Sequence, residues 1–280
     1  IVLSLATAGT GGFGILNDSF VSYSTSAQLV TTIFMIIFGV NFNVYYYILI
    51  KDFKAAFKCE EARWYFGIII VSVLLIAFNI TSMFNYFFEA LKHAFFNVGS
   101  VITTTGFASN DFNTWPEFSK TILLILMFIG ACAGSTGGGI KVSRIVIMMK
   151  DFKNTVDHYV FPRKIKHVFF EGKALNNDLV YSIRSYISIY FFLFFISLLL
   201  ISLNNLDFAT NFSAVAACFN NIGPAFGLAG PMSNYNCFNY FSKIVLIFDM
   251  LAGRLELIPI LILFSLAKNR RKQVKAIEDE

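Results

Sequence analysis

The most restrictive feature of this sequence is a unit that recurs along the chain. The unit is a long apolar segment, a shorter apolar segment that runs into a glycine-containing loop, a second long apolar segment and a basic stretch. It is complete at Tyr65–Lys150 and at Ile183–Leu266, and a third copy at Ile1–Lys51 lacks the first long segment. Internal repetition indicates one supersecondary unit that is used several times. We therefore expect equivalent units packed around a shared centre.

The long segments are apolar enough to cross a bilayer, which takes about 20 residues in a helix. Only 14% of the residues are charged and 56% are apolar, whereas an average soluble domain has about 25% charged and about 45–50% apolar residues. This composition argues against a soluble enzyme, a disordered chain and a nucleic-acid-binding protein. The predicted spans are Ala27–Ile50, Tyr65–Tyr86, Ile122–Met149, Ile183–Leu203 and Lys243–Leu266.

The basic residues give these spans an orientation. Three stretches, Lys51–Arg63, Lys141–Arg184 and Lys268–Lys275, hold 18 of the 22 Lys and Arg residues. The positive-inside rule places such stretches in the cytoplasm. The shorter apolar segments then lie on the outer side, where they are too short to cross and are predicted to be re-entrant half-helices. They are Ile1–Ala8, Glu89–Ile102 and Ala209–Phe219.

Each half-helix runs into a short loop rich in Thr, Gly and Asn. Irregular backbone is tolerated at membrane depth only where it lines a water-filled path or is buried in protein, and the C-terminal end of a helix favours a cation. Glycine lets successive carbonyls turn toward one axis, and carbonyl rings replace the hydration shell of an ion in potassium filters. None of these loops carries Asp, Glu, Lys or Arg, so we predict selection of a cation by backbone dipoles. The short loops are Thr7–Phe13, Thr103–Phe107 and Asn220–Pro224.

The span Ile122–Met149 is predicted to open at Gly130–Gly139, which holds five glycines. Each Gly costs roughly 1 kcal/mol relative to Ala inside a helix. Opened backbone must line a cavity, so we expect this glycine-rich loop to lie below the filter. A phosphate-binding loop does not fit, because Lys141 comes one place too late and no strand precedes the loop. A glycine stripe for helix packing is the remaining alternative.

Arg254 lies inside the last predicted span, where a charge costs at least about 2.5–3.5 kcal/mol. A spacing of 31 residues recurs between a short-loop glycine and a later residue, so we expect the three later residues at one level around the axis. The pairs are Gly12 and Asn43, Gly106 and Gly137, and Gly223 and Arg254. We infer that Arg254 donates to carbonyls of the glycine-rich loop, or pairs with Asp249 or Glu256. Its charge would also form a barrier to cations.

At these residues the sequence resembles the Trk/Ktr/HKT superfamily of potassium transporters, and more closely its bacterial TrkH-like subunits. The matching stretches are Val101–Pro116, Gly130–Lys141, Asn220–Pro224 and Gly253–Pro259. The resemblance covers essentially the whole chain, as the later part of such a protein. It implies an all-α membrane protein with repeated span–pore helix–filter loop–span units around a pseudo-fourfold pore, of which this chain holds three filter loops. The implied units are 1–51 (second half of repeat 2), 64–150 (repeat 3), 181–267 (repeat 4) and 268–280 (cytoplasmic tail).

The resemblance also implies a function and its residues. It implies potassium uptake across the bacterial inner membrane by a multi-pass protein that is not an enzyme, with K⁺ as the transported ion and no cofactor. The implied filter is Thr10, Gly11 and Gly12, Thr104, Thr105 and Gly106, and Asn221, Ile222 and Gly223. The implied gate is Gly134, Ser135, Thr136, Gly137, Gly138, Gly139, Lys141 and Arg254.

The partners implied by the resemblance are membrane lipid, a second copy of the chain and a cytosolic nucleotide-binding regulatory subunit of TrkA type, with no nucleic acid. The basic stretch Phe152–Lys173 is the expected contact surface for the cytosolic partner. Coupling of uptake to H⁺ or Na⁺ stays open.

An intramembrane enzyme and a structural membrane fragment are the alternatives. The three histidines are isolated in the sequence, and the spans carry no paired Asp, HExxH or GxSxG motif. Asp249 and Glu256 lie seven residues apart and could form a proton relay. A further span–loop–span repeat upstream in the gene would count against a structural fragment.

Overall fold

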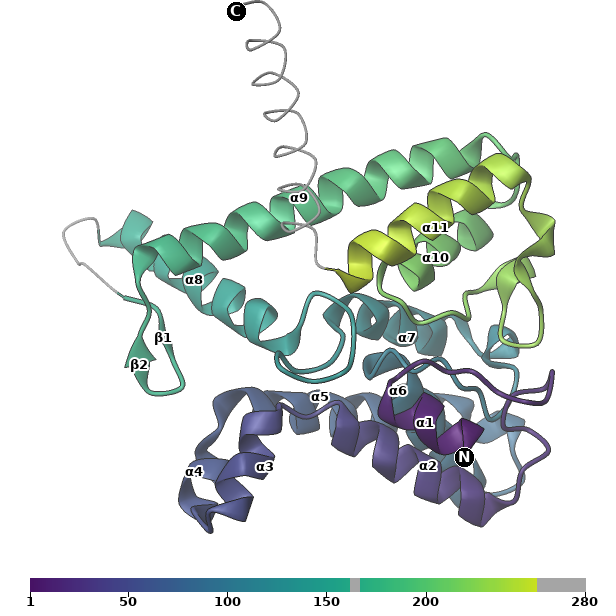
Figure 1. Cartoon of the computed structure of the whole chain (residues 1–280), viewed down its shortest axis with the longest axis horizontal. Coiled ribbons are helices and arrows are strands. Elements are labelled where there is room, and N and C mark those ends of the chain that lie inside the picture. The colour runs from purple at the N-terminus through teal and green to yellow at the C-terminus, as the bar shows by residue number, and fades with distance from the viewer. Residues whose placement is uncertain (162–166, 256–280) are drawn as a thin grey trace, which may run out of the picture.

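The computed structural model describes residues 1–161 and 167–255 of the 280-residue chain (Figure 1). Almost all regular structure in this part is helical, as the predicted all-α class requires. The helices are α1 Val2–Ala8, α2 Thr25–Phe38, α3 Phe42–Leu49, α4 Phe53–Lys58, α5 Glu60–Ile80, α6 Phe87–Ile102, α7 Glu117–Ile129, α8 Val142–Val160, α9 Asn177–Ser202, α10 Phe208–Phe219 and α11 Tyr240–Arg254. Two short antiparallel strands, β1 Phe169–Phe170 and β2 Lys173–Ala174, form a hairpin between α8 and α9.

Two helices, α5 and α9, are each long and apolar enough to cross a membrane, and α2 and α3 pass that test only as a pair. This pair bends by 91°, so the prediction of one continuous span at Ala27–Ile50 is wrong. The bend follows Gly39, where a Cβ atom would lie 2.3 Å from the Tyr65 hydroxyl. Asn41 then restarts the chain as α3, because its side chain accepts the N–H of Asn43 at 2.9 Å.

The interrupted span is found where the sequence predicts it. Helix α7 ends at Ile129, the glycine-rich loop follows, and α8 begins at Val142. The predicted last span continues beyond α11 into residues outside the described part of the chain. The predicted tail 268–280 and Glu256 also lie outside it.

The three short helices α1, α6 and α10 lie close to the predicted half-helices. Helix α6 packs between α5 and α7, α10 packs between α9 and α11, and α1 lies beside α2. Helix α2 also contacts α6, and α7 contacts α10, so that the units adjoin in chain order (Figure 1). This arrangement directs the ends of the three short helices toward the same part of the molecule.

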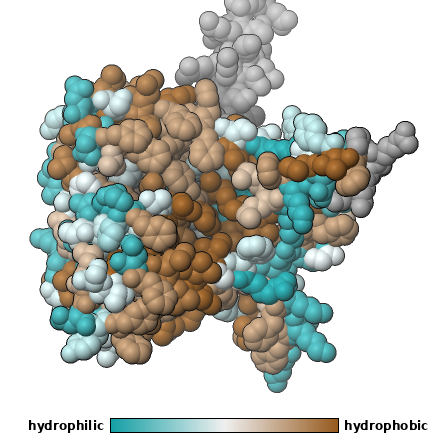
Figure 2. All heavy atoms as spheres, turned by 180° about the vertical axis from the view of Figure 1, so that it is seen from behind, coloured by the Kyte–Doolittle hydropathy of each residue, from teal (hydrophilic) through white to brown (hydrophobic). Residues whose placement is uncertain are grey.

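The outer surface of the long helices is apolar. Figure 2 shows a broad hydrophobic area on one face of the molecule, and large exposed apolar side chains follow α5, α9 and α11. In α5 these are Trp64, Phe66, Ile70, Val71, Leu74, Leu75 and Phe78. Soluble monomers rarely expose so continuous an apolar surface, and it suits contact with lipid.

Asp207 caps α10 at its N-terminus and gives a first testable prediction. Its carboxylate accepts the N–H of Thr210 at 2.8 Å, and hydrogen bonds from Thr210 lower the pKa of that carboxyl. Loss of such a cap costs about 1 kcal/mol, so Asp207→Ala is expected to lower the melting temperature by about 2–4 °C. Asp207→Asn keeps an acceptor and should melt close to the parent.

The contribution of the Asp207 cap depends on pH. Because the pKa of this carboxyl is lower in the folded protein, the carboxylate stabilises the fold at pH values above its ordinary pKa. This contribution is lost as the pH falls through the lowered pKa. The difference in melting temperature between Asp207→Ala and the parent should therefore shrink in acid, and a difference that does not change with pH would contradict the role of Asp207 as a cap.

Candidate functional site

The three short loops share one backbone conformation. After each short helix a residue in the left-handed region is followed, two residues later, by a glycine with positive φ. These pairs are Thr10 (φ 49°) and Gly12 (66°), Thr104 (55°) and Gly106 (87°), and Asn221 (58°) and Gly223 (104°). The same order of backbone angles at three places supports a structural repeat beyond the hydropathy pattern.

The same pair of hydrogen bonds closes each short helix. The N–H of the left-handed residue bonds the carbonyl three residues earlier, and the next N–H bonds the carbonyl five residues earlier, which is the Schellman pattern. The longer-range bonds are Gly11 N–H to Ala6 O (2.8 Å), Thr105 N–H to Ser100 O (2.9 Å) and Ile222 N–H to Ala217 O (2.8 Å). Each short loop is therefore held to the C-terminal end of its helix.

Thr10 and Thr104 are strained, because β-branched residues rarely adopt the left-handed region. Such strain costs about 1–3 kcal/mol per residue and persists only where the surroundings enforce it. Both hydroxyls bond the glycine-rich loop. Thr10 Oγ1 donates to Thr136 O at 2.8 Å, and Gly138 N–H donates to Thr104 Oγ1 at 2.6 Å. These two bonds offset part of the strain and join two short loops to the glycine-rich loop, a role that the sequence analysis did not foresee.

The three short loops lie side by side. A Cβ atom on Gly12 would lie 1.9 Å from Thr105 O, and a Cβ atom on Gly106 would lie 1.9 Å from Ile222 O. A Cβ atom on Gly223 would meet no atom within 4 Å. The contacts therefore run in one direction, from each loop to the next in the chain. A cavity of about 230 Å³ is lined by all three glycines.

The glycine-rich loop packs against the opposite ends of the short loops. A Cβ atom on Gly138 would lie 2.4 Å from Asn220 O, and one on Gly137 would lie 3.0 Å from Thr103 O. These carbonyls belong to the helix-proximal ends of the short loops, whereas the cavity is lined by the glycines at the distal ends. The short loops therefore separate the cavity from the glycine-rich loop.

Arg254, predicted to be a buried charge inside the last span, lies against the glycine-rich loop but is exposed in the described part of the chain. Its Nη1 donates to Thr136 O at 3.0 Å, so that this one carbonyl accepts from both Arg254 and Thr10. Of the partners considered from the sequence, the structure has Arg254 on the loop carbonyl, whereas Asp249 accepts from Ser197 Oγ at 2.6 Å. The preceding Gly253 lets α11 approach α10, since a Cβ atom there would lie 1.9 Å from Phe219 O. The Lys141 ammonium donates to a further loop carbonyl, that of Gly137.

The first unit contacts the glycine-rich loop one to four residues before Asn43, the residue that the 31-residue spacing predicts. Contacts with the glycine-rich loop come from Gly39 O, which accepts the N–H of Cys132 at 3.0 Å, and from Phe42 N–H, which donates to Gly134 O at 3.1 Å. Asn43 lies instead in the wall of a neighbouring cavity that Asn41 also lines. The first unit therefore reaches the loop close to the predicted position, through backbone groups on either side of the bend between α2 and α3.

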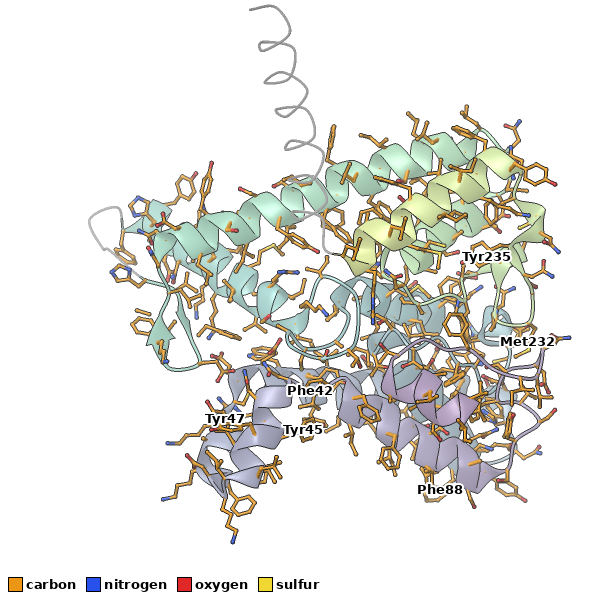
Figure 3. All side chains as sticks on the ribbon, in the orientation of Figure 1. Phe42, Tyr45, Tyr47, Phe88, Met232 and Tyr235 are labelled. Atoms are coloured by element: carbon orange, nitrogen blue, oxygen red, sulfur yellow. The ribbon has the colours of Figure 1, made fainter. Side chains whose placement is uncertain are left out.

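Two further contacts were missed by the sequence analysis. Tyr235 (labelled in Figure 3) donates its hydroxyl to the carbonyl of Gly223 at 2.6 Å, so that one carbonyl of the third short loop already has a partner. The buried carboxylate of Glu61 accepts hydrogen bonds from both sides of the glycine-rich loop. Within residues 1–161 and 167–255 no group of three or more His, Cys, Asp or Glu side chains is placed to hold a metal ion.

Comparison with known proteins agrees with this architecture. A family profile for TrkH, described as a cation transport protein, matches residues 1–275. The Trk system potassium uptake proteins TrkH of Escherichia coli and Vibrio parahaemolyticus are 31% and 33% identical over 269 residues, which cover 94% of this chain and 55% of each relative. The crystal structure of the potassium transporter TrkH from Vibrio parahaemolyticus matches with a TM-score of 0.84 and 31% identity, over 93% of this chain and 56% of that one. This chain thus spans about half the length of these relatives, and it belongs to the TrkH family of cation transport proteins.

Proposed function

We propose that this chain forms most of a potassium-uptake pathway through the bacterial inner membrane. The observation that carries the proposal is the convergence of three identically folded short loops on one cavity, with the glycine-rich loop and Arg254 on their other side. The named relatives are potassium uptake proteins, which are transporters and not enzymes. The ion is substrate, and the proposal requires no cofactor.

The proposed filter consists of Thr10, Gly11 and Gly12 with the equivalent residues of the other two short loops, Thr104, Thr105 and Gly106, and Asn221, Ile222 and Gly223. Each loop follows a helix C-terminus, whose partial negative charge favours a cation. The loops offer backbone carbonyls in place of charged side chains, so that an ion would exchange its hydration shell for carbonyl oxygens. A fourth loop of the same kind fits beside Gly223, where a side-chain position is open.

The proposed gate is the glycine-rich loop with Lys141 and Arg254. The loop crosses directly under the helix-proximal ends of the filter loops. Two positive side chains bond its carbonyls, at Gly137 and at Thr136. A cation that passes the filter would therefore meet both a steric and an electrostatic barrier.

The proposed membrane placement rests on charge, and the proposed partners rest on the resemblance to TrkH-like subunits. The cytoplasmic end carries α4 and the hairpin of β1 and β2, and the basic stretch Phe152–Lys173, of which residues 162–166 lie outside the described part of the chain, is assigned to the same side by its charge. We propose this stretch as the contact surface for a cytosolic nucleotide-binding regulatory subunit of TrkA type, and we propose a homodimer in lipid.

The function is tested by rubidium uptake into vesicles that contain the purified full-length protein. The expected result is uptake that K⁺ suppresses more strongly than Na⁺ at equal concentration, since carbonyl filters distinguish the two ions. Protein-free vesicles are the control, and a measurement with and without a proton gradient distinguishes coupled from channel-like uptake. Failure to take up rubidium above the protein-free vesicles would overturn the proposal.

A further inference from the structure

Glu61 is a buried carboxylate that the filter and gate described so far do not use. It lies in the first turn of α5, and its side chain is almost completely buried, with the residue 2% exposed. Its Oε1 accepts the N–H of Ala133 at 2.6 Å and the N–H of Ser143 at 3.1 Å. Its Oε2 accepts from Nδ2 of Asn41 at 3.0 Å. Both carboxylate oxygens therefore accept hydrogen bonds, and the donors come from three different segments.

These three donors surround the glycine-rich loop. Ala133 lies at the start of the loop, and Ser143 lies in the first turn of α8, directly after it. Asn41 lies at the bend of α2 and α3, and the neighbouring Phe42 N–H donates to Gly134 O. One carboxylate thus holds both flanks of the loop and the bend that contacts it. A glutamine side chain could not replace the carboxylate at both positions, because it offers one acceptor and one donor.

The backbone of the same residue is held by the cytoplasmic hairpin. The N–H of Glu61 donates to Oε1 of Glu171 at 3.1 Å, and the Cys59 thiol donates to the same oxygen at 3.3 Å. Glu171 lies in the turn between β1 and β2. Burial raises the pKa of the Cys59 thiol to about 11, so that the thiol keeps its proton for this bond.

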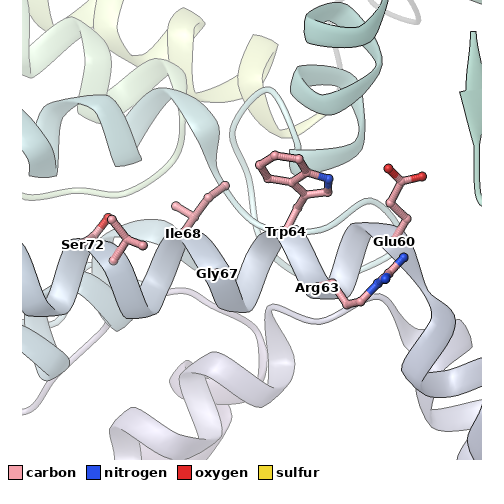
Figure 4. Close-up of a pocket in the computed structure, with 7 residues that line it drawn as sticks. Glu60, Arg63, Trp64, Gly67, Ile68 and Ser72 are labelled. Atoms are coloured by element: carbon pink, nitrogen blue, oxygen red, sulfur yellow. The ribbon is translucent and has the colours of Figure 1, made fainter.

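A second contact fixes the hairpin to the same turn of α5. The Lys150 ammonium of α8 pairs with Glu60 and donates to Phe169 O of β1 at 2.7 Å. Glu60 and Glu61 are neighbours with different environments, because Glu60 lines an open groove of about 620 Å³ with Trp64 and Ser72 (Figure 4). The first turn of α5 therefore connects the cytoplasmic hairpin with the glycine-rich loop.

We propose that Glu61 is the positioning residue of the gate, and that it links the position of the hairpin to the closed conformation of the glycine-rich loop. The proposal rests on the function proposed above. A cytosolic partner that moves the hairpin would pull on the N–H of Glu61 through Glu171, and the carboxylate of Glu61 would carry that displacement to both flanks of the loop.

The test measures rubidium uptake by the full-length protein in vesicles without a cytosolic partner. Glu61→Gln keeps the size of the side chain and removes one acceptor, so unregulated uptake is expected to rise about tenfold, as for the loss of one buried hydrogen-bond partner. The ratio of K⁺ to Na⁺ uptake should stay unchanged, because the short loops are untouched. Glu61→Asp keeps the carboxylate and should give a smaller rise. Glu117→Gln, which removes the exposed pair with Lys120 at the start of α7, is the control and should stay within about twofold of the parent, as for a surface ion pair.

A double-mutant cycle separates positioning from a general loss of stability. Rubidium uptake by the double mutant Glu61→Gln/Arg254→Ala should be only slightly higher than uptake by Arg254→Ala alone. It should lie well below the value expected if the two single effects multiplied, because both changes release the same loop. Glu171→Gln should raise uptake by a few-fold in the parent, as for a weakened hydrogen bond, and should have no effect in the Glu61→Gln background.

The outcomes distinguish this proposal from the proposed function. A parent protein without rubidium uptake overturns the function. A parent that transports, with Glu61→Gln equal to Glu117→Gln or with multiplicative effects in the double mutant, overturns the role of Glu61 alone. If Glu61→Gln does not fold, Glu61→Asp and Glu171→Gln decide, and parental uptake in both overturns the proposal.

Discussion

Replacing Gly106 by serine is expected to reduce the preference for K⁺ over Na⁺ by about tenfold or more, which corresponds to about 1.4 kcal/mol of discrimination. The reason is a clash together with strain. Gly106 has φ 87°, and a Cβ atom there would lie 1.9 Å from Ile222 O, so that this carbonyl must move. Ile222 O belongs to the neighbouring short loop, and its displacement alters two of the proposed filter loops at once. The measurement is the ratio of rubidium uptake to sodium uptake in vesicles.

Two serine variants serve as controls for Gly106→Ser. Gly67 lies in α5, and a Cβ atom there meets no atom within 4 Å, so Gly67→Ser should keep the parental ratio. Gly223→Ser introduces strain at φ 104° without a neighbouring atom, and it should change the ratio less than Gly106→Ser does. A parental ratio in a well-folded Gly106→Ser protein would show that Gly106 lies outside the filter.

The repeat unit could be predicted because it depends on local sequence patterns. Segment lengths and hydropathy separate the long helices α5 and α9 from the short helices α6 and α10, and the glycines of 130–139 reveal the break between α7 and α8. These features need only the sequence neighbours of each residue. The predicted order of elements therefore agrees with the structure, including the place of the glycine-rich loop.

The bend between α2 and α3 could not be predicted, because its cause is distant in sequence. Gly39 packs against the Tyr65 hydroxyl and the Thr103 methyl, and its carbonyl accepts the N–H of Cys132. Window-averaged hydropathy makes 27–50 a continuous span, although Gly39, Asn41 and Asn43 stand at the bend. Tertiary contacts override the local preference here.

Two kinds of site residue also escaped the sequence analysis. Glu61 looks like an ordinary acidic residue in the first turn of a helix, which the helix dipole favours. Its donors Ala133 and Ser143 contribute only backbone N–H groups, which the sequence does not distinguish from any others. For Thr10 and Thr104 the sequence predicts only a role of their backbone carbonyls, whereas in the structure their hydroxyls also bond the glycine-rich loop. Contacts of this kind appear only once the backbone is known.

Replacing Arg254 by alanine is expected to raise cation uptake by about tenfold or more while the ratio of K⁺ to Na⁺ uptake is kept. Arg254 donates to Thr136 O in the glycine-rich loop, so the change removes both a bond that holds the loop and a positive charge beside the proposed path. A unit charge about 4 Å from a cation costs about 1 kcal/mol in water and about 4 kcal/mol at an effective dielectric constant of 20. The measurement is rubidium uptake by the full-length protein in vesicles, alongside the sodium ratio.

Arg254→Lys separates the two contributions of Arg254. Lysine keeps the positive charge but loses the planar guanidinium that reaches Thr136 O. If the charge forms the barrier, Arg254→Lys should stay near the parent, and if the bond holds the loop, it should resemble Arg254→Ala. Lys120→Ala, which removes one exposed pair with Glu117 at the start of α7, controls for net charge. Unchanged uptake in a well-expressed Arg254→Ala protein would remove Arg254 from the gate.

The expected effects of Gly106 and Arg254 differ because the two residues act on opposite ends of the short loops. Gly106 lines the cavity at the distal ends, where Ile222 O is its neighbour, so its substitution should alter which ion passes. Arg254 acts through Thr136 at the helix-proximal ends, so its substitution should alter how often any ion passes. Thr10 connects the two regions, because its hydroxyl shares Thr136 O with Arg254. A change of the ion ratio in Arg254→Ala would therefore mean that release of this shared carbonyl also displaces the filter, and that gate and filter act as one unit.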